Sequence, residues 1–427
     1  MLDNISKFER PLNITKVFTQ VLLFMILPPV VGLPYAIYTI SHGVIKKEKT
    51  DYFVFFICIA FYLAAINATK IPGGDQVNYY VAYMNVPIKG FWYSLCNIYG
   101  LLKSYEIEST QISGEFMNGI YNYVGYYLTF GYYPLFEFLF TAISYLLLFT
   151  GLYRFCLTLS KPHIPIVCGV LIIAFFYLYF QYTLHIQKQF FAQAIMMYVI
   201  GNYAYYGKLR KKDYIAIICS VFTHQSMLFF VPFVILKRFR KKMTTSTSLF
   251  VLLIFAILIF YGPRMLGGIN VDGDSALSHG VGRFVESEGK VDLSSSLVFS
   301  QVLVIALPMA YTCVKRLLAY KKHFIASQSF LVIVASLLLV AVLAMSNQPL
   351  SQYRFFMMLI AFIPFIFPLL LDDLRMRNKL LKFLAGLMIV WFFVHFSFII
   401  WDYASEWQIL FCPPILLIII GNAGLIY

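Results

Sequence analysis

A four-residue repeat of polar side chains is the first candidate for chemistry in an otherwise apolar sequence. Its members are Gln181, His185, Gln189 and Gln193, with Gln187 and Lys188 beside them. A spacing of four keeps neighbouring side chains on one face of a helix. Polar groups at membrane depth are costly and tend to face a bundle interior or a cavity. The repeat therefore predicts either hydrogen bonds between helices or one wall of a cleft for a polar substrate.

Three side chains are candidates for proton transfer. His224 lies alone in an apolar run, Glu137 lies inside the run that begins at Pro134, and Asp75 follows two glycines. We favour His224 as a general base because the unperturbed pKa of histidine lies near operating pH. The alternatives are a hydrogen-bonded core histidine at 224 and an ordinary loop turn at Asp75.

Two arginines are candidates for binding a phosphate. Arg354 follows a polar stretch that contains Gln352, at the mouth of an apolar run, and Arg283 lies in a segment rich in glycine and serine. Guanidinium groups bind phosphates through two parallel hydrogen bonds. The alternative role for both is to anchor the chain at lipid headgroups.

The composition excludes an ordinary soluble fold. Hydrophobic residues make up 61% of the 427 residues and charged residues 12%, about half the share in soluble domains. The net charge of +14 comes largely from short loops between apolar runs, which is the positive-inside pattern of membrane proteins. We therefore expect membrane lipids around the chain and no nucleic acid as a partner. No nucleotide-binding or metal-ligand motif is present, so neither a cofactor nor a metal is expected.

The elements that must position these residues are transmembrane helices. The apolar runs predict one all-α polytopic domain over residues 1–427, with about eleven spans. They are 17–40, 52–69, 134–157, 164–184, 189–206, 246–262, 297–314, 324–345, 355–371, 383–400 and 408–424. The basic loops between them face the cytoplasm in this arrangement, which puts the N-terminus outside and the C-terminus inside. Pro28, Pro29 and Pro34 leave open a hairpin in place of the first span, with the N-terminus inside.

The apolar segment 214–236 does not fit the alternation of cytoplasmic and external loops, because basic residues stand on both sides of it. We predict a re-entrant hairpin with Thr223, His224 and Gln225 near its tip, which must be buried in protein or line a cavity. Two long segments, 70–133 and 263–296, are predicted to be external. The tyrosines that crowd the first of them suit either the flat faces of sugar rings or an aromatic belt at the membrane surface.

Several short motifs in order resemble the EpsG family, the Wzy-type polymerases of bacterial exopolysaccharide, capsule and O-antigen. They are a GGDxxxYY-like element at 73–80, a proline opening the third span, a polar-Lys-Gln run opening the fifth and an FxHQSxL-like hairpin at 222–228. The resemblance is best over residues 50–240. It implies a GT-C-like membrane glycosyltransferase in the bacterial inner membrane. The implied reaction transfers a glycan chain from undecaprenyl pyrophosphate to a lipid-linked repeat unit on the periplasmic face.

The resemblance also implies site residues. Family arginines correspond to Lys70 and Lys188, and a family glutamate falls on Tyr133, with Glu137 one helical turn deeper. His224 corresponds without change. Undecaprenyl-pyrophosphate-linked glycans are then the substrates, and a chain-length regulator is a further partner to consider. The rival functions are a flippase of lipid-linked oligosaccharides and a glycosyltransferase that adds one sugar from a polyprenyl phosphate.

Overall fold

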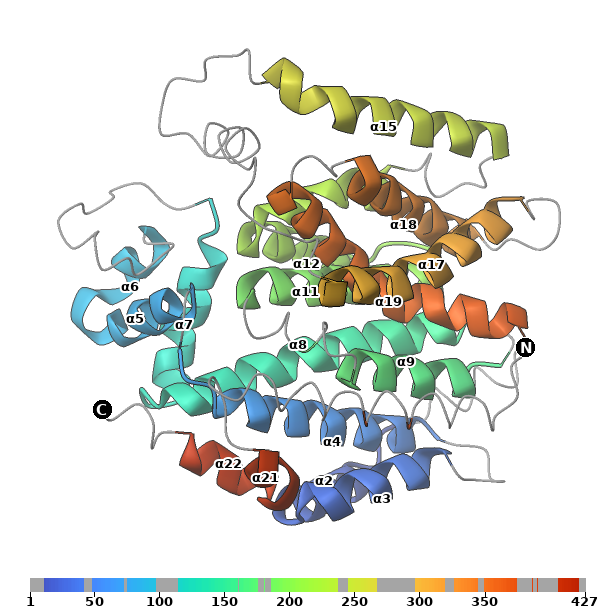
Figure 1. Cartoon of the computed structure of the whole chain (residues 1–427). Coiled ribbons are helices and arrows are strands. Elements are labelled where there is room, and N and C mark those ends of the chain that lie inside the picture. Colours follow the sequence, from blue (N-terminus) through green and yellow to red (C-terminus); the bar gives the residue numbers. More distant parts are fainter. Residues whose placement is uncertain are drawn as a thin grey trace.

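Helices are the one kind of regular structure in the described part of the chain. The computed structural model describes residues 11–41, 48–72, 75–96, 114–159, 161–175, 180, 186–236, 245–266, 296–318, 326–344, 349–374, 386, 390 and 406–421. These residues form helices and no strand (Figure 1), which confirms the predicted all-α class. The first half holds α2 (Ile14–Ile26), α3 (Pro29–Ser41), α4 (Lys49–Ala68), α5 (Asp75–Met84), α6 (Val86–Cys96), α7 (Met117–Leu128), α8 (Tyr133–Cys156), α9 (His163–Phe175) and α11 (Gln187–Tyr206). The second holds α12 (Lys211–Thr223), the 3₁₀ helix η2 (Gln225–Phe229), α13 (Val231–Ile235), α15 (Thr245–Leu266), α17 (Ser296–Leu318), α18 (Ala326–Ala344), α19 (Pro349–Leu374), α21 (Glu406–Phe411) and α22 (Pro414–Ile420).

Two helices, α4 and α8, are long and apolar enough by themselves to cross a membrane within the described residues. Shorter apolar stretches occur in α2, α9, α15, α18 and α19. The predicted spans from 52 to 371 each correspond to a helix, although α9 ends at Phe175, before the predicted limit of 184. Most of the predicted span 383–400 lies outside the described residues. The total of about eleven spans and the GT-C-like architecture stay predictions.

The predicted first span is wrong, because 17–40 forms two short helices that break at Pro28. The start of α2 meets the start of α4, where Lys16 Nζ lies 2.7 Å from Asp51 Oδ1. Met25, near the end of α2, packs in one cluster with Ala64 and Ala65 near the end of α4. Helices α2 and α4 therefore run in the same direction, so the chain returns between them. This is the hairpin alternative, in which proline removes a backbone donor and stops the helix.

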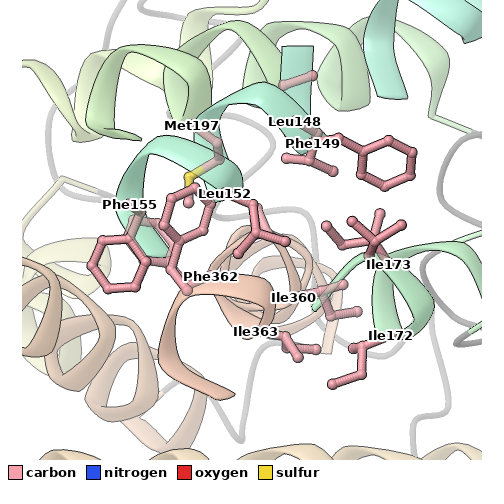
Figure 2. Close-up of a cluster of buried hydrophobic side chains, with 14 of the residues drawn as sticks. Leu148, Phe149, Leu152, Phe155, Ile172, Ile173, Met197, Ile360, Phe362 and Ile363 are labelled. Atoms are coloured by element: carbon pink, nitrogen blue, oxygen red, sulfur yellow. The ribbon is translucent and has the colours of Figure 1, made fainter. Parts of the chain in front are cut away.

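The core of the bundle is formed by α8, α9, α11 and α19. Figure 2 shows Leu152 and Phe155 of α8 among Met197 of α11, Ile173 of α9 and Phe362 of α19. Helices α8 and α11 cross at two glycines. A Cβ on Gly151 or Gly201 would run into the backbone of the other helix, so glycine permits the close approach.

The segment 214–236 is broken where the hairpin tip was predicted. Helix α12 ends at Thr223, His224 has an extended backbone at φ −152° and ψ 121°, and η2 begins at Gln225. A break leaves backbone N–H and C=O groups that need new partners. Entry of this hairpin into the membrane from one side stays a prediction.

Several of the functional candidates that the structure describes lie at one end of the bundle, which we call the α8-start end. Helix α4 finishes there and α8 begins there, with α5, α6 and α7 close by at the left of Figure 1. The predicted direction of the last span is wrong. Tyr132 donates a hydrogen bond to the carbonyl of Ile418 at 2.8 Å, so α22 finishes at the α8-start end. Pro413 and Pro414 also divide the predicted span 408–424 into α21 and α22.

Candidate functional site

Glu137 is the centre of a buried polar cluster between α4, α8 and α11. Lys70 Nζ lies 2.8 Å from its Oε2, and Asn67 Nδ2 donates to the same oxygen at 3.2 Å. Gln187 Nε2 lies 3.1 Å from both carboxylate oxygens. The side chains of Lys70 and Glu137 are 3% and 1% exposed. Each side of the carboxylate therefore meets a donor, and we call this group the Glu137 cluster.

A second group, the Glu115 cluster, lies beside the break in the hairpin. Glu115 stands just before α7, and its Oε2 accepts a hydrogen bond from Lys188 Nζ at 3.0 Å. Its other oxygen accepts the backbone N–H of Gln225 at 3.2 Å. Lys188 also lies over the ring of Tyr79, 5.5 Å from the centroid. One carboxylate therefore joins the start of α7 to α11 and to the hairpin.

Helix α7 supplies further partners for the broken backbone. Asn118 Nδ2 donates to the carbonyl of Thr223 at 2.7 Å, and Tyr121 Oη lies 3.2 Å from the Thr223 hydroxyl. Gly114 passes so close to the side chain of Gln225 that a Cβ there would clash with it. Gly114 and α7 are thus docked onto the break between α12 and η2.

His224 is held by its own local turn. Its Nδ1 accepts the backbone N–H of Ser226 at 3.3 Å and lies 2.6 Å from the Ser226 hydroxyl. In a neutral imidazole one nitrogen accepts and the other carries the hydrogen. Acceptance at Nδ1 therefore puts the hydrogen on Nε2, which makes that nitrogen a donor.

The two clusters are neighbours because Gln187 and Lys188 are consecutive at the start of α11. Gln187 reaches Glu137, and Lys188 reaches Glu115. Burial alone would raise the pKa of Glu115, but the charge of Lys188 and the hydrogen bonds that Glu115 accepts from Lys188 and Gln225 outweigh burial and lower it. Glu115 is therefore held as a carboxylate at neutral pH.

The tyrosines of α5 and α7 mostly pack against neighbouring aromatic rings. Tyr83 is fully buried and contacts the rings of Tyr126, Tyr133 and Phe136 in tilted and edge-on arrangements. Its hydroxyl lies 2.6 Å from that of Thr129. These rings fasten α5 and α7 to the start of α8. The two roles that the sequence suggested for the tyrosines stay predictions.

The structure brings five of the predicted site residues together: Lys70, Glu137, Gln187, Lys188 and His224. Gln189 is buried in α11 close to them. Gln352 donates to the carbonyl of Val342 at 2.8 Å. Arg354 belongs to the first turns of α19, next to Phe355, whose ring lies 6.2 Å from that of Phe229 in η2. Asp75 begins α5, whereas His185, Gln181 and Arg283 lie outside the described residues.

Two members of the clusters were missed from the sequence. Glu115 lies in a polar segment with no motif around it, and Asn67 looks like one polar residue at the end of an apolar run. Asn67 also donates to Thr141 at 2.6 Å. Either residue can be recognised only in the folded structure, where segments far apart in the sequence come together.

Comparison with known proteins agrees with the motifs. A model of the EpsG family matches residues 53–410, well beyond residues 50–240 where the motifs are clearest. No curated protein and no solved structure matches the chain. Because the match covers most of the sequence, the chain belongs to the EpsG family, whose members are membrane proteins resembling Wzy-type exopolysaccharide polymerases.

Proposed function

We propose that the protein is a polysaccharide polymerase. It transfers a glycan chain from undecaprenyl pyrophosphate to the free sugar of a lipid-linked repeat unit, on the external face of the bacterial inner membrane. The family supports a polymerase-like role in polysaccharide biosynthesis. The observation that carries the proposal is Lys188, a cation whose side chain is only 8% exposed at the α8-start end.

The reaction needs a cation of this kind. Transfer breaks the anomeric C–O bond, and negative charge grows on the departing pyrophosphate. Fixed donors in a site of low dielectric constant stabilise such charge effectively. We assign Lys188 to the pyrophosphate, together with Arg354 and Arg283, the two arginines that the sequence suggested for phosphate binding. The hydrogen on Nε2 makes His224 a further donor to this group.

Lys70 plays a different part in this proposal. Its ammonium is committed to Glu137, and lysine offers a point charge where arginine offers a two-pronged fork. Lys70 and Gln187 therefore shape the site by fixing Glu137, and they do not bind the pyrophosphate themselves.

The test uses purified protein in lipid vesicles with an undecaprenyl-pyrophosphate-linked repeat unit and no nucleotide sugar. Gel separation should show a ladder of whole repeats that Lys188→Gln and Arg354→Ala abolish. Lys16→Gln is the matched control, because Lys16 is also a lysine paired with a carboxylate but lies at the start of α4, away from the α8-start end.

Other products would identify the rival functions. Transfer of the intact repeat unit across the bilayer without a ladder would show a flippase. Addition of a single sugar, from a polyprenyl-phosphate donor supplied in parallel, would show a glycosyltransferase of another kind. Either result would overturn the polymerase.

A further inference from the structure

The geometry of the Glu115 cluster points to a catalytic residue that the sequence did not suggest. We propose that Glu115 is the general base of the transfer. Lys188 holds Glu115 inactive until the donor's pyrophosphate replaces Glu115 as the ion-pair partner of Lys188. This inference rests on the proposed polymerase function.

Two of the candidate bases that the sequence suggested, Glu137 and His224, are occupied. Glu137 receives Lys70, Asn67 and Gln187 on its two oxygens, so its carboxylate is bound on several sides. The lone pair of His224 at Nδ1 accepts from Ser226. A base needs a lone pair directed at the hydroxyl group, and neither residue offers one without breaking a buried contact.

Glu115 differs because one of its partners is a cation that the reaction itself recruits. A pyrophosphate carries more negative charge than a carboxylate, so it competes for Lys188 by the same attraction that now binds Glu115. Loss of Lys188 leaves the Glu115 carboxylate with the backbone N–H of Gln225, which keeps it at the hairpin tip. Without Lys188 the carboxylate also becomes a stronger base, because an opposite charge nearby favours its ionised form.

The chemical step then balances as follows. The acceptor oxygen forms a bond to the anomeric carbon of the donor chain, and the bond from that carbon to the pyrophosphate oxygen breaks. The electron pair leaves with the pyrophosphate, next to Lys188 and the Nε2–H of His224. The proton of the acceptor hydroxyl group passes to a carboxylate oxygen of Glu115. Donor binding and activation of the base are thereby a single event.

Binding of inorganic pyrophosphate to the ligand-free, full-length protein tests, without any turnover, the exchange of Glu115 for pyrophosphate as the partner of Lys188. Glu115→Gln keeps the shape but frees Lys188, so pyrophosphate should bind at least about tenfold more tightly than to the wild type. The tightening should vanish in Glu115→Gln combined with Lys188→Gln. Unchanged affinity in Glu115→Gln would overturn the exchange.

Polymer formation tests the base. Glu115→Gln should slow ladder growth about a hundredfold or more, and added formate should partly restore Glu115→Ala but not Lys188→Gln. Tighter pyrophosphate binding with wild-type ladder growth would overturn the base role, as would a folded Glu115→Ala that formate does not rescue. If Glu115→Gln fails to fold, Glu115→Asp takes its place. The shorter carboxylate should bind Lys188 more weakly, and ladder growth should be retained.

The two proposals fail separately. A wild-type protein that makes no ladder contradicts the polymerase, whereas the pyrophosphate measurement still decides whether Glu115 and the anion compete for Lys188. A wild-type ladder that Glu115→Gln leaves intact contradicts only the role of Glu115.

Discussion

Replacing Glu137 with glutamine should destabilise the protein more than any single change at its surface. The variant keeps the shape of the side chain but leaves the ammonium of Lys70 in a place where only 3% of that side chain is exposed. Removing one partner of a buried ion pair lowers the free energy of unfolding by about 3–5 kcal/mol, because the remaining charge has no counter-ion. That is a large part of the roughly 5–15 kcal/mol by which typical domains are stable.

The assay is thermal unfolding in detergent. Its readout is the fraction of heated protein that stays monodisperse in gel filtration. The pair Lys70→Met with Glu137→Leu is the control, because apolar residues of similar volume replace a buried ion pair at little cost. The double variant should therefore be more stable than Glu137→Gln alone. If Glu137→Gln unfolds like the wild type but makes no polymer, Glu137 is a catalytic carboxylate and our structural assignment is wrong.

Two further predictions concern helix packing and pH. Gly201→Leu should cost at least about 1–3 kcal/mol, since its side chain meets the backbone of Gly151 on α8, and the same unfolding assay would measure the loss. The lowered pKa of Glu115 means that its ion pair with Lys188 adds stability above the ordinary carboxyl range and loses it as pH falls through the lowered pKa. The gap in unfolding temperature between wild type and Glu115→Gln should therefore be present at pH 7 and close in strong acid, and a gap independent of pH would contradict the assignment.

Hydropathy predicted the helices of the middle of the chain well, because a long apolar run leaves few choices. Helix α4 agrees within a few residues with the predicted span 52–69, and α8 with 134–157. The errors fall at prolines. Pro28 and Pro413 interrupt runs that are predominantly apolar. An averaged hydropathy value does not detect that one residue lacks the backbone N–H that a continuous helix needs.

The site was predictable where neighbours in space are neighbours along a helix. Tyr133 and Glu137 share a face of α8, as the spacing of four implied. Glu115 could not be found in this way. Its partners Lys188 and Gln225 lie 73 and 110 residues away, and nothing in the local sequence records that meeting.

The paired helices α2 and α3 have a consequence for how the chain enters the membrane. Because the chain starts and finishes this pair at the same end of α4, the polar residues before α2 need not pass through the hydrocarbon region. Carrying residues such as Lys7 and Arg10 across would cost several kcal/mol for each charge. The first event of biogenesis can then be the insertion of a hairpin as a unit. We then expect α4 to be the first helix that carries the chain across the membrane.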